Sequence, residues 1–421
     1  MELESKCLYS GYSPENGGPQ TLPIYQSTTF KYNSTEQVAK LFDLTENGFF
    51  YSRLANPTVD AVEQKIADLE GGVGALMTSS GQSANFIAVV NILSAGDHMI
   101  CSNAVYGGTF NLFAVTLKRM GIEVTFVDQD LTIEELQQYV KPNTKAVFGE
   151  TITNPTISVL DIEKFAQFAH NNKVPLIIDN TFATPVLCRP FEFGADIVTH
   201  STTKYIDGHA LTVGGVIVDS GNFDWTNGNF PDMTTPDESY HGVTYTKEFG
   251  KAAYIVKARV QLMRDLGTTQ SAFGAFLINQ GLETLPMRIK AHSDNAKKMA
   301  EFLSNHEKVE FVSYPTLEGN KYNELAQKYL PDGCSGVIAF NLKGGRDAGI
   351  KFIDSLKMVS LLVHVADIRS CVLHPASSTH RQMSDSQLLE AGITPGLIRF
   401  SVGVENIKDI IADVSQALDQ I

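Results

Sequence analysis

Polar residues whose side chains can bind ligands or take part in reactions follow five short apolar runs of this 421-residue chain, at the point where each run ends. They offer hydroxyl, amide, carboxylate, aromatic and ammonium groups, which loops that only reverse the chain do not need. In an open α/β sheet, ligands bind beyond the carboxyl ends of the strands. The sequence therefore predicts a ligand site built from five segments: Thr78–Ser83, Ser102–Thr109, Gly149–Pro155, Asp179–Thr181 and Thr199–Lys204.

Two of these segments carry charged side chains. Lys204 follows the hydroxyl residues Ser201, Thr202 and Thr203 and stands 25 residues after Asp179, one strand-plus-helix step further on. A lysine amine with a lowered pKa forms a Schiff base with a carbonyl compound, whereas an isolated lysine is ordinarily a solvated surface residue. Asp179 either caps local main-chain groups or faces a cationic ligand atom.

The segment Thr78–Ser83 precedes a predicted helix. N–H groups at a helix start, made approachable by Gly81, suit a phosphate, although an ordinary helix cap has the same composition. A phosphate loop, an acid at a strand end and a lysine after a later strand are together what pyridoxal phosphate requires. Tyr106 either stacks on the cofactor ring or packs in the core. The combination predicts a pyridoxal-phosphate enzyme.

The elements that position these residues alternate regularly. The predicted strands are Ala75–Met77, His98–Cys101, Val124–Val127, Ala146–Phe148, Leu176–Ile178, Ile197–Val198 and Val216–Val218. The predicted helices between and before them are Thr58–Glu70, Gln82–Leu93, Gly107–Met120, Ile133–Val140 and Ile162–Asn171. This rhythm is typical of βαβ units, so we expect an α/β fold with a mainly parallel seven-stranded sheet between helices.

Composition and the alternation of predicted strands and helices divide the chain into three parts. Residues 1–60 are predicted to form an irregular arm against a neighbouring subunit, with one helix at Ser34–Phe42 that begins with a Ser34–Gln37 capping box. Residues 61–266 are predicted to form the cofactor domain, and residues 267–421 are predicted to form a smaller C-terminal α+β domain. The later predicted helices are Thr246–Asp265, Ser271–His306, Tyr322–Tyr329, Asp347–Ser355, Ser384–Ala391 and Ile407–Gln420. The later predicted strands are Val309–Ser313, Gly336–Asn341, Lys357–Leu362 and Leu397–Val402.

Composition limits the partners and the compartment. The chain has 47 Asp and Glu residues against 33 Lys and Arg, a net charge of −14 that disfavours nucleic acid or an anionic membrane as a partner. Its 5 cysteines form no CxxC pair, which predicts a reduced cytoplasmic protein with buried thiols. His374 and His380 do not have the spacing of a zinc pair, so no metal is expected. We also expect no signal peptide and no membrane span.

Eight ordered motifs match one known family. They are Pro23–Thr28, Tyr51–Thr58, Leu69–Gly72, Ser79–Gln82, Tyr106–Thr109, Asp179–Pro185, His374–Ser377 and Arg399–Gly403. Through them nearly the whole chain resembles the Cys/Met-metabolism enzymes of the fold-type I pyridoxal-phosphate class, and most closely their O-acetylhomoserine sulfhydrylase branch. The segment Thr234–Gly242 resembles an insertion of that branch, and Gly108 stands where methionine γ-lyases carry a cysteine.

The resemblance implies roles around the cofactor. Lys204 would form the Schiff base and move protons, Asp179 would pair with the ring nitrogen, and Tyr106 would stack on the ring and act as an acid toward the leaving group. Asn154 would bond the ring hydroxyl. The phosphate would be held by Gly81, Gln82, Ser201 and Thr203, together with Tyr51 and Arg53 from a neighbouring subunit of a homotetramer built from dimers.

The resemblance also implies a substrate-binding group. Arg399 would bind the substrate α-carboxylate in a bidentate pair, beside His364 and Ser370, whereas from sequence alone Arg53 and Arg399 could equally form surface ion pairs. The chain departs from the family at Ala210, where glycine is usual, and at His364, where an amide or hydroxyl side chain is expected.

The activity implied is γ-replacement: sulfide or another thiol displaces acetate from O-acetyl-L-homoserine and gives L-homocysteine or methionine. Proton transfer by Lys204 near neutral pH requires its pKa to fall well below about 10.4. One alternative is a γ-lyase that releases 2-oxobutanoate and ammonia. A second is a binding or structural protein that has kept the fold. A nicotinamide oxidoreductase is disfavoured because no GxGxxG follows the first strand.

Overall fold

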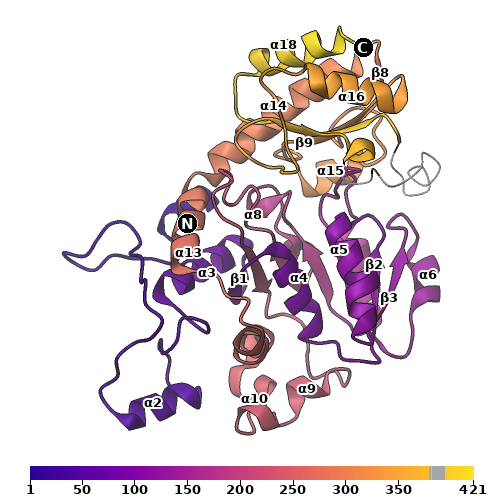
Figure 1. Cartoon of the computed structure of the whole chain (residues 1–421). Coiled ribbons are helices and arrows are strands. Elements are labelled where there is room, and N and C mark those ends of the chain that lie inside the picture. The colour runs from indigo at the N-terminus through magenta and orange to yellow at the C-terminus, as the bar shows by residue number, and fades with distance from the viewer. Residues whose placement is uncertain (379–380, 382–393) are drawn as a thin grey trace.

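The computed structural model describes residues 1–378, 381 and 394–421, and its larger sheet has seven strands in the order β1-β7-β6-β5-β4-β2-β3 (Figure 1). The strands are β1 (Gly74–Thr78), β2 (His98–Ser102), β3 (Glu123–Val127), β4 (Thr144–Glu150), β5 (Leu176–Asp179), β6 (Ile197–His200) and β7 (Gly215–Asp219). β7 runs antiparallel to β1 and β6, and the other neighbouring pairs are parallel. The predicted α/β fold is confirmed, and each of the seven strands predicted for this sheet lies within an observed one.

Helices and short turns precede, connect and follow these strands. The helices are α3 (Pro57–Glu70), α4 (Gly81–Val90), α5 (Gly107–Asn111), α6 (Ile133–Leu136), α7 (Ile162–Asn171), α8 (Thr184–Leu187), α9 (Pro231–Thr234), α10 (Tyr245–Phe249), α11 (Ala253–Lys257) and α12 (Arg264–Leu266). α3 and α4 both pack on β7, whose five residues are all buried. A strand buried on both faces reads as a continuous apolar run, which is why the strands were visible in the sequence.

Several predicted helices are interrupted. The helix from Gly107 continues after α5 as a π-helical segment, Leu112–Leu117. The helix predicted at Ser271–His306 is two helices, α13 (Ala272–Glu283) and α14 (Leu285–Ser304), because Pro286 has no N–H to continue the hydrogen-bond ladder. The helix predicted at Thr246–Asp265 breaks at Gly250, where φ is 51°.

The N-terminal arm contains more helix than predicted. α1 (Leu3–Tyr9) packs against α3 and α13, and its Cys7 is buried. Further along the arm, α2 (Thr35–Phe42) begins after Ser34, whose Oγ accepts the Gln37 N–H at 3.1 Å. The capping box is only half formed, because the Gln37 side chain accepts from the Asn33 N–H and not from Ser34.

A second sheet has the order β10-β11-β12-β9-β8. Its strands are β8 (Val309–Ser313), β9 (Val337–Leu342), β10 (Ser360–Leu361), β11 (Cys371–Leu373) and β12 (Leu397–Ser401), with helices α15 (Asn323–Tyr329), α16 (Gly345–Ser355) and α18 (Ile407–Leu418). The sequence did not predict β11, whose three residues are too few to show a period. The helix predicted at Ser384–Ala391 lies outside the described residues.

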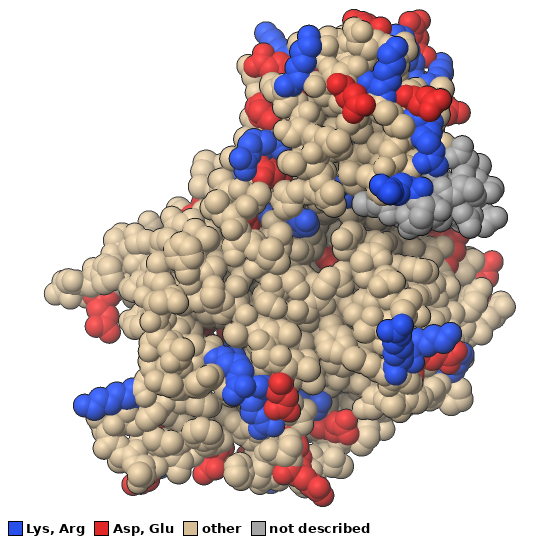
Figure 2. Space-filling view, viewed as in Figure 1, with Lys and Arg blue, Asp and Glu red and all other residues tan. Residues whose placement is uncertain are grey.

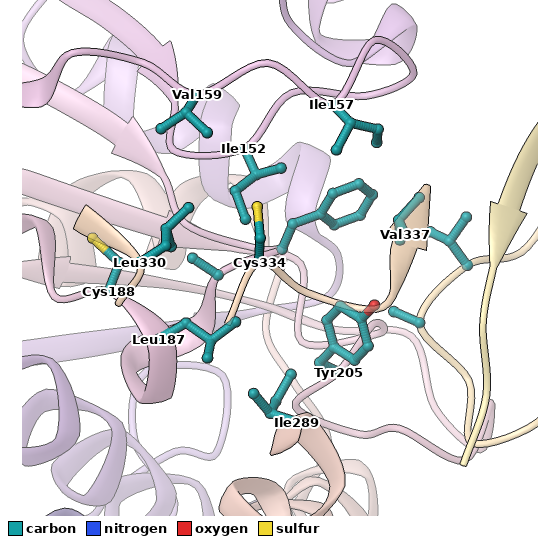
Figure 3. Packing of buried hydrophobic residues seen from close by; sticks show 14 of the residues in the cluster. Ile152, Ile157, Val159, Leu187, Cys188, Tyr205, Ile289, Leu330, Cys334 and Val337 are labelled. Atoms are coloured by element: carbon teal, nitrogen blue, oxygen red, sulfur yellow. The ribbon is translucent and has the colours of Figure 1, made fainter. Parts of the chain in front are cut away.

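One buried apolar cluster extends through both sheets. Figure 3 shows Ile152 and Leu187 from the first sheet's loops and helices packed with Ile289 of α14 and Val337 of β9. Tyr205 lies in this cluster, and its hydroxyl accepts the Gly336 N–H at 2.8 Å. Because Tyr205 follows Lys204 in the chain, the packing that joins the two sheets also fixes the main chain at Lys204.

The five cysteines are free and buried, which confirms the predicted burial of the thiols. Within the described parts of the chain, no helix is both long and apolar enough to cross a membrane. The same residues contain no group of three or more His, Cys, Asp or Glu side chains placed to hold a metal ion.

Candidate active site

A cavity of about 250 Å³ opens where the predicted polar segments meet, beyond the carboxyl ends of β1, β4, β5 and β6. The second sheet contributes Arg399 from β12. The cavity brings together most of the predicted site residues: Gly81, Gln82, Tyr106, Asn154, Asp179, Ser201, Thr203, Lys204 and Arg399. Residues spread over more than three hundred positions of sequence thus line one pocket.

The start of α4 forms one end of the pocket. Ser80 caps the helix, its Oγ accepting the Ser83 N–H at 3.1 Å. A Cβ added at Gly81 would lie 2.6 Å from Ser201 Cβ, so only glycine allows the helix start to approach this loop so closely. The first N–H groups of a helix have no partner inside it and attract an anion. This end of the pocket therefore suits a phosphate.

Asp179 occupies the end of β5 in a fixed orientation. One carboxylate oxygen accepts from Asn85 Nδ2 at 3.1 Å, and the other accepts from the Thr181 N–H at 3.0 Å. Asn85 is held in turn, because its Oδ1 accepts from the Thr199 hydroxyl at 2.6 Å. The sequence analysis did not find Asn85, which lies in the middle of α4 and reads there as an ordinary helical residue.

Lys204 has the chemical character that the sequence analysis required of it. Burial lowers the pKa of its amine from 10.5 to about 8, and the nearby positive charge of Arg399 acts in the same direction. Lys204 Nζ lies 3.4 Å from His364 Nδ1. At pH 7 about one-tenth of such an amine is uncharged, far more than for a lysine with the ordinary pKa.

Glu150 is a second site residue that the sequence analysis missed. It ends β4, is 5% exposed, and accepts the Tyr106 N–H at 2.7 Å as well as a main-chain hydrogen bond from Asn154. Burial, and secondarily the charge of Asp179, raise its carboxyl pKa well above 4.5. The signal was present, since Glu150 lies directly after an apolar strand. The side chain links the two segments that carry Tyr106 and Asn154.

Arg399 is 8% exposed and incompletely paired. Its Nη1 lies 3.4 Å from Asn154 Oδ1 and its Nη2 lies 3.3 Å from the His364 carbonyl oxygen. Its Nε is buried and has no hydrogen-bond partner among the described residues. A buried cation with an unused donor fits an anionic ligand group such as a carboxylate.

His364 contacts Lys204 through its Nδ1 at 3.4 Å but is not among the residues that line the cavity, and three other predicted site residues lie outside the pocket. Tyr51 and Arg53 line two other cavities beside the arm, with the Arg53 guanidinium 5.2 Å from the centre of the Tyr51 ring. Ser370 is buried, and its hydroxyl donates to Glu405 at 2.9 Å and accepts the Gly403 N–H at 2.9 Å. Within one chain, the structure therefore does not bring these three residues to Lys204.

The residues present fit pyridoxal phosphate. The start of α4 and the adjoining hydroxyl residues suit its phosphate, Asp179 suits a protonated ring nitrogen, and Lys204 supplies an amine for its aldehyde. The unused Nε of Arg399 remains for a second anion, which a carboxylate of an amino-acid substrate would provide.

Comparison with known proteins gives the same result along the whole chain. Residues 4–419 match the family described as Cys/Met metabolism PLP-dependent enzyme. An O-acetyl-L-homoserine sulfhydrylase of Leptospira meyeri is 45% identical over 99% of this chain and 97% of its own length. A homocysteine synthase of Schizosaccharomyces pombe is 45% identical over 99% of this chain and 98% of its own length.

Solved structures agree. A Campylobacter jejuni crystal structure, assigned as an O-acetylhomoserine (thiol)-lyase and holding a pyridoxyl-lysine phosphate, is 38% identical. It superposes with a TM-score of 0.95 and covers 100% of both chains. A metB structure from Corynebacterium glutamicum has a TM-score of 0.84 and 35% identity, covering 100% of this chain and 98% of that one. This chain therefore belongs to the Cys/Met metabolism family of enzymes that depend on pyridoxal phosphate.

Proposed function

We propose that the protein catalyses γ-replacement on O-acetyl-L-homoserine, in which sulfide or another thiol takes the place of acetate and gives L-homocysteine or methionine. One observation carries the proposal. The amine of Lys204, whose pKa is lowered to about 8, lies in the same pocket as Asp179 and the incompletely paired guanidinium of Arg399. The sulfhydrylase and homocysteine synthase names of full-length relatives support the choice of substrate.

Each side chain of the pocket has a distinct role in the proposed reaction. Bound pyridoxal phosphate supplies an electron-withdrawing ring that stabilises negative charge on the substrate carbons. Asp179 keeps the ring nitrogen protonated, and Arg399 holds the substrate carboxylate. Lys204 takes the proton from Cα and later moves protons at the neighbouring carbon atoms. Tyr106 provides a hydroxyl group toward the departing acetate.

A second copy of the chain would complete the site. We place Tyr51 and Arg53 of one subunit at the phosphate of another. The arm of residues 1–60 would then contribute to a neighbouring active site. The expected assembly is a homotetramer of paired subunits. Figure 2 supports a subunit contact: charged side chains gather at the top and along the lower edge, and a broad area between them is nearly free of charge. The cofactor domain would be residues 61–266 and the C-terminal domain residues 267–421.

The proposal for the cellular compartment is based on the state of the cysteine thiols. Five unpaired buried cysteines suit a reducing environment, so we place the enzyme in the cytoplasm. Small amino acids and sulfide or thiols are its expected partners.

A γ-lyase is the competing function, and Gly108 argues against it. A Cβ at Gly108 would lie 2.5 Å from a ring carbon of Tyr106, so the cysteine of methionine γ-lyases has no room here unless Tyr106 moves. The environment of Tyr106 thus differs from the one that a lyase of that kind requires.

The test is a paired assay of the purified full-length protein with pyridoxal phosphate. O-acetylhomoserine and O-succinylhomoserine are each supplied with sulfide and with methanethiol, and homocysteine, methionine and the released acid are measured by mass spectrometry. We expect homocysteine and acetate from O-acetylhomoserine. Rapid release of 2-oxobutanoate from methionine or homocysteine alone would show a lyase instead, and a protein that stays colourless with the cofactor would indicate a non-catalytic relative.

A further inference from the structure

Asn85 is a buried amide on α4, the helix whose start forms the phosphate end of the pocket. It follows Gly81 by one helical turn, so the two residues lie on the same face of the helix. Its side chain lines the pocket and is 1% exposed. The proposed reaction gives this amide no role of its own, yet it contacts Asp179, the acid assigned to the cofactor ring.

Both ends of the Asn85 amide have hydrogen-bond partners. Nδ2 lies 3.1 Å from Asp179 Oδ2 and 3.4 Å from Thr109 Oγ1. Oδ1 accepts from the Thr199 hydroxyl at 2.6 Å, and both threonines are completely buried. An amide has two N–H donors and a carbonyl acceptor, so these contacts hold it in one orientation. The donor end of the amide is therefore the end that meets Asp179.

The contacts of Asp179 leave one direction open on its carboxylate. Oδ1 accepts from the Thr181 N–H at 3.0 Å and from the Thr181 hydroxyl at 2.5 Å, whereas Oδ2 accepts from Asn85. An ionised carboxylate offers about four acceptor positions, two on each oxygen. The described residues fill three of them, and the fourth, on Oδ2, remains for a donor in the pocket. The N–H of a protonated pyridine ring is such a donor.

The orientation of the amide and the charge of Asp179 support each other. An ionised carboxylate only accepts hydrogen bonds, so it requires the N–H end of Asn85. With the amide turned over, Oδ1 would face the carboxylate, and two acceptors would repel each other unless Asp179 took up a proton. The Thr199 hydroxyl opposes that reversal because it donates to Oδ1. A hydrogen bond to the ionised form favours that form, so Asn85 makes Asp179 less able to take the proton of the ring nitrogen.

The main chain at Asp179 is fixed by contacts that do not involve α4. β5 and β6 pair in parallel, with Asp179 opposite Thr199. The next residues, Asn180 and His200, point to the other face of the sheet. There Asn180 Nδ2 and His200 Nε2 lie 3.0 and 2.6 Å from Glu70 Oε1. Replacing the amide on α4 should therefore change the direction and charge of the carboxylate and leave the strands in place.

We propose that Asn85 is a positioning residue for the acid of the cofactor: it orients Asp179 Oδ2 toward the ring nitrogen and keeps the proton on that nitrogen. The inference rests on the proposed function for the role given to Asp179, and it holds whichever substrate the enzyme uses. α4 then serves the cofactor twice, with its first N–H groups at the phosphate and its amide at the acid one turn later.

Four variants of the full-length protein test the amide and the hydroxyl that orients it. Asn85→Leu replaces the amide by an apolar group of similar size. Thr199→Val removes the orienting hydroxyl, and Thr199→Ser retains it. Asn91→Leu is the matched control, because Asn91 is a buried amide at the other end of α4 that donates to the Tyr254 carbonyl oxygen at 2.9 Å.

Each protein is stripped of cofactor and reloaded with pyridoxal phosphate that carries nitrogen-15 in its ring. The nitrogen-15 NMR signal reports whether the ring nitrogen is protonated, which a purely structural role of Asn85 would not change. Cofactor affinity is measured by titration. Loading is checked by trapping, in which the cofactor on Lys204 is reduced with borohydride and quantified by mass spectrometry. Steady-state kinetics with O-acetylhomoserine and sulfide separate kcat from KM.

We expect a protonated ring nitrogen in wild type, Thr199→Ser and Asn91→Leu. In Asn85→Leu the signal should move toward that of a neutral ring. Cofactor affinity and kcat should each fall about tenfold in this variant, the usual effect of losing a hydrogen bond to a charged group, while KM changes less than about threefold. Thr199→Val should shift the signal in the same direction, because the amide is then free to turn over.

An unchanged ring signal in Asn85→Leu overturns the inference, and an unchanged signal in Thr199→Val overturns it if Asn85→Leu does not fold. A loss of ring protonation in Asn91→Leu as large as in Asn85→Leu would show a general packing effect and also overturn it. Wild-type protein with a protonated ring but no homocysteine production would refute the proposed function, while the variants still test Asn85. A neutral ring nitrogen in wild type overturns the inference whatever the activity.

Discussion

The side chain of Glu150 accepts the main-chain N–H of Tyr106 at 2.7 Å and so ties the end of β4 to the segment after β2. Burial raises the pKa of this carboxyl well above 4.5, which favours its neutral form compared with an exposed glutamate. The Glu150 side chain holds the main chain at Tyr106 in place.

The first prediction follows from that neutrality. Glu150→Gln keeps a neutral acceptor of the same shape and should retain kcat/KM within about threefold, whereas Glu150→Ala should lower it about tenfold through loss of the Tyr106 hydrogen bond. Steady-state kinetics and cofactor affinity measure both. The exposed Glu123 gives matched Gln and Ala controls. Equal damage from both Glu150 variants would mean that the ionised carboxylate is needed.

The second prediction concerns the pH dependence of Lys204. Only the uncharged amine attacks an aldehyde, so cofactor trapping should rise with pH and reach half its maximum near pH 8 instead of near 10.5. Lys204→Ala should abolish trapping and turnover without changing the circular dichroism spectrum. The exposed Lys118→Ala serves as control. Turnover by Lys204→Ala would refute the assignment of this lysine as the catalytic base.

The third prediction separates two effects of Arg399. Arg399→Gln should lower kcat/KM for O-acetylhomoserine about 100-fold, because the substrate carboxylate loses a bidentate charged partner. The same variant should shift the trapping midpoint of Lys204 to higher pH, because a neighbouring positive charge has been removed. Arg189→Gln, at a surface pair with Glu192, should show neither effect. A midpoint that moves to lower pH would contradict the assigned charge coupling.

The fourth prediction concerns stability. Burial raises the pKa of Asp219 from 3.8 to about 7, and its Oδ2 has no partner in the described structure. Between these values the folded state binds a proton that the unfolded state has released, so stability falls as pH rises, by at most about 1.4 kcal/mol per pH unit. Asp219→Asn removes this loss.

Thermal unfolding at pH 5.5, 7 and 8 measures that prediction. The melting temperature of Asp219→Asn minus that of wild type should increase from pH 5.5 to 7 and change little above 7. The exposed Asp347→Asn should give a nearly constant difference over the same range. A constant difference for Asp219→Asn as well would show that its carboxyl titrates normally in the folded protein.

The sequence predicted those parts of the molecule whose physical causes are local. β2 and β7 are short apolar runs because they are fully buried, and Asp179 and Lys204 are polar residues directly beyond such runs. Residues whose roles depend on distant partners were less accessible. Asn85 looks like any helical residue until its contacts with Asp179 and Thr199 are seen.

Other misses have the same origin. α1 is too short to be stable alone and forms against α3 and α13, which no local pattern records. Ser370 seemed suited to bind substrate by analogy, but within this chain its hydroxyl is already bonded to Glu405. His364 stood out as a departure from the family, but its sequence position did not reveal that its Nδ1 lies 3.4 Å from Lys204 Nζ.

The cluster around Tyr205 has a consequence for selectivity. Lys204 follows β6 of the first sheet and Arg399 lies in β12 of the second, so the distance between these two side chains depends on how the two sheets pack. On the proposed function, the packing of the core therefore determines which length of substrate chain fits between the two side chains. Volume changes at Ile289 or Val337, which line this packing, should alter the preference between three- and four-carbon amino acids before they unfold the protein.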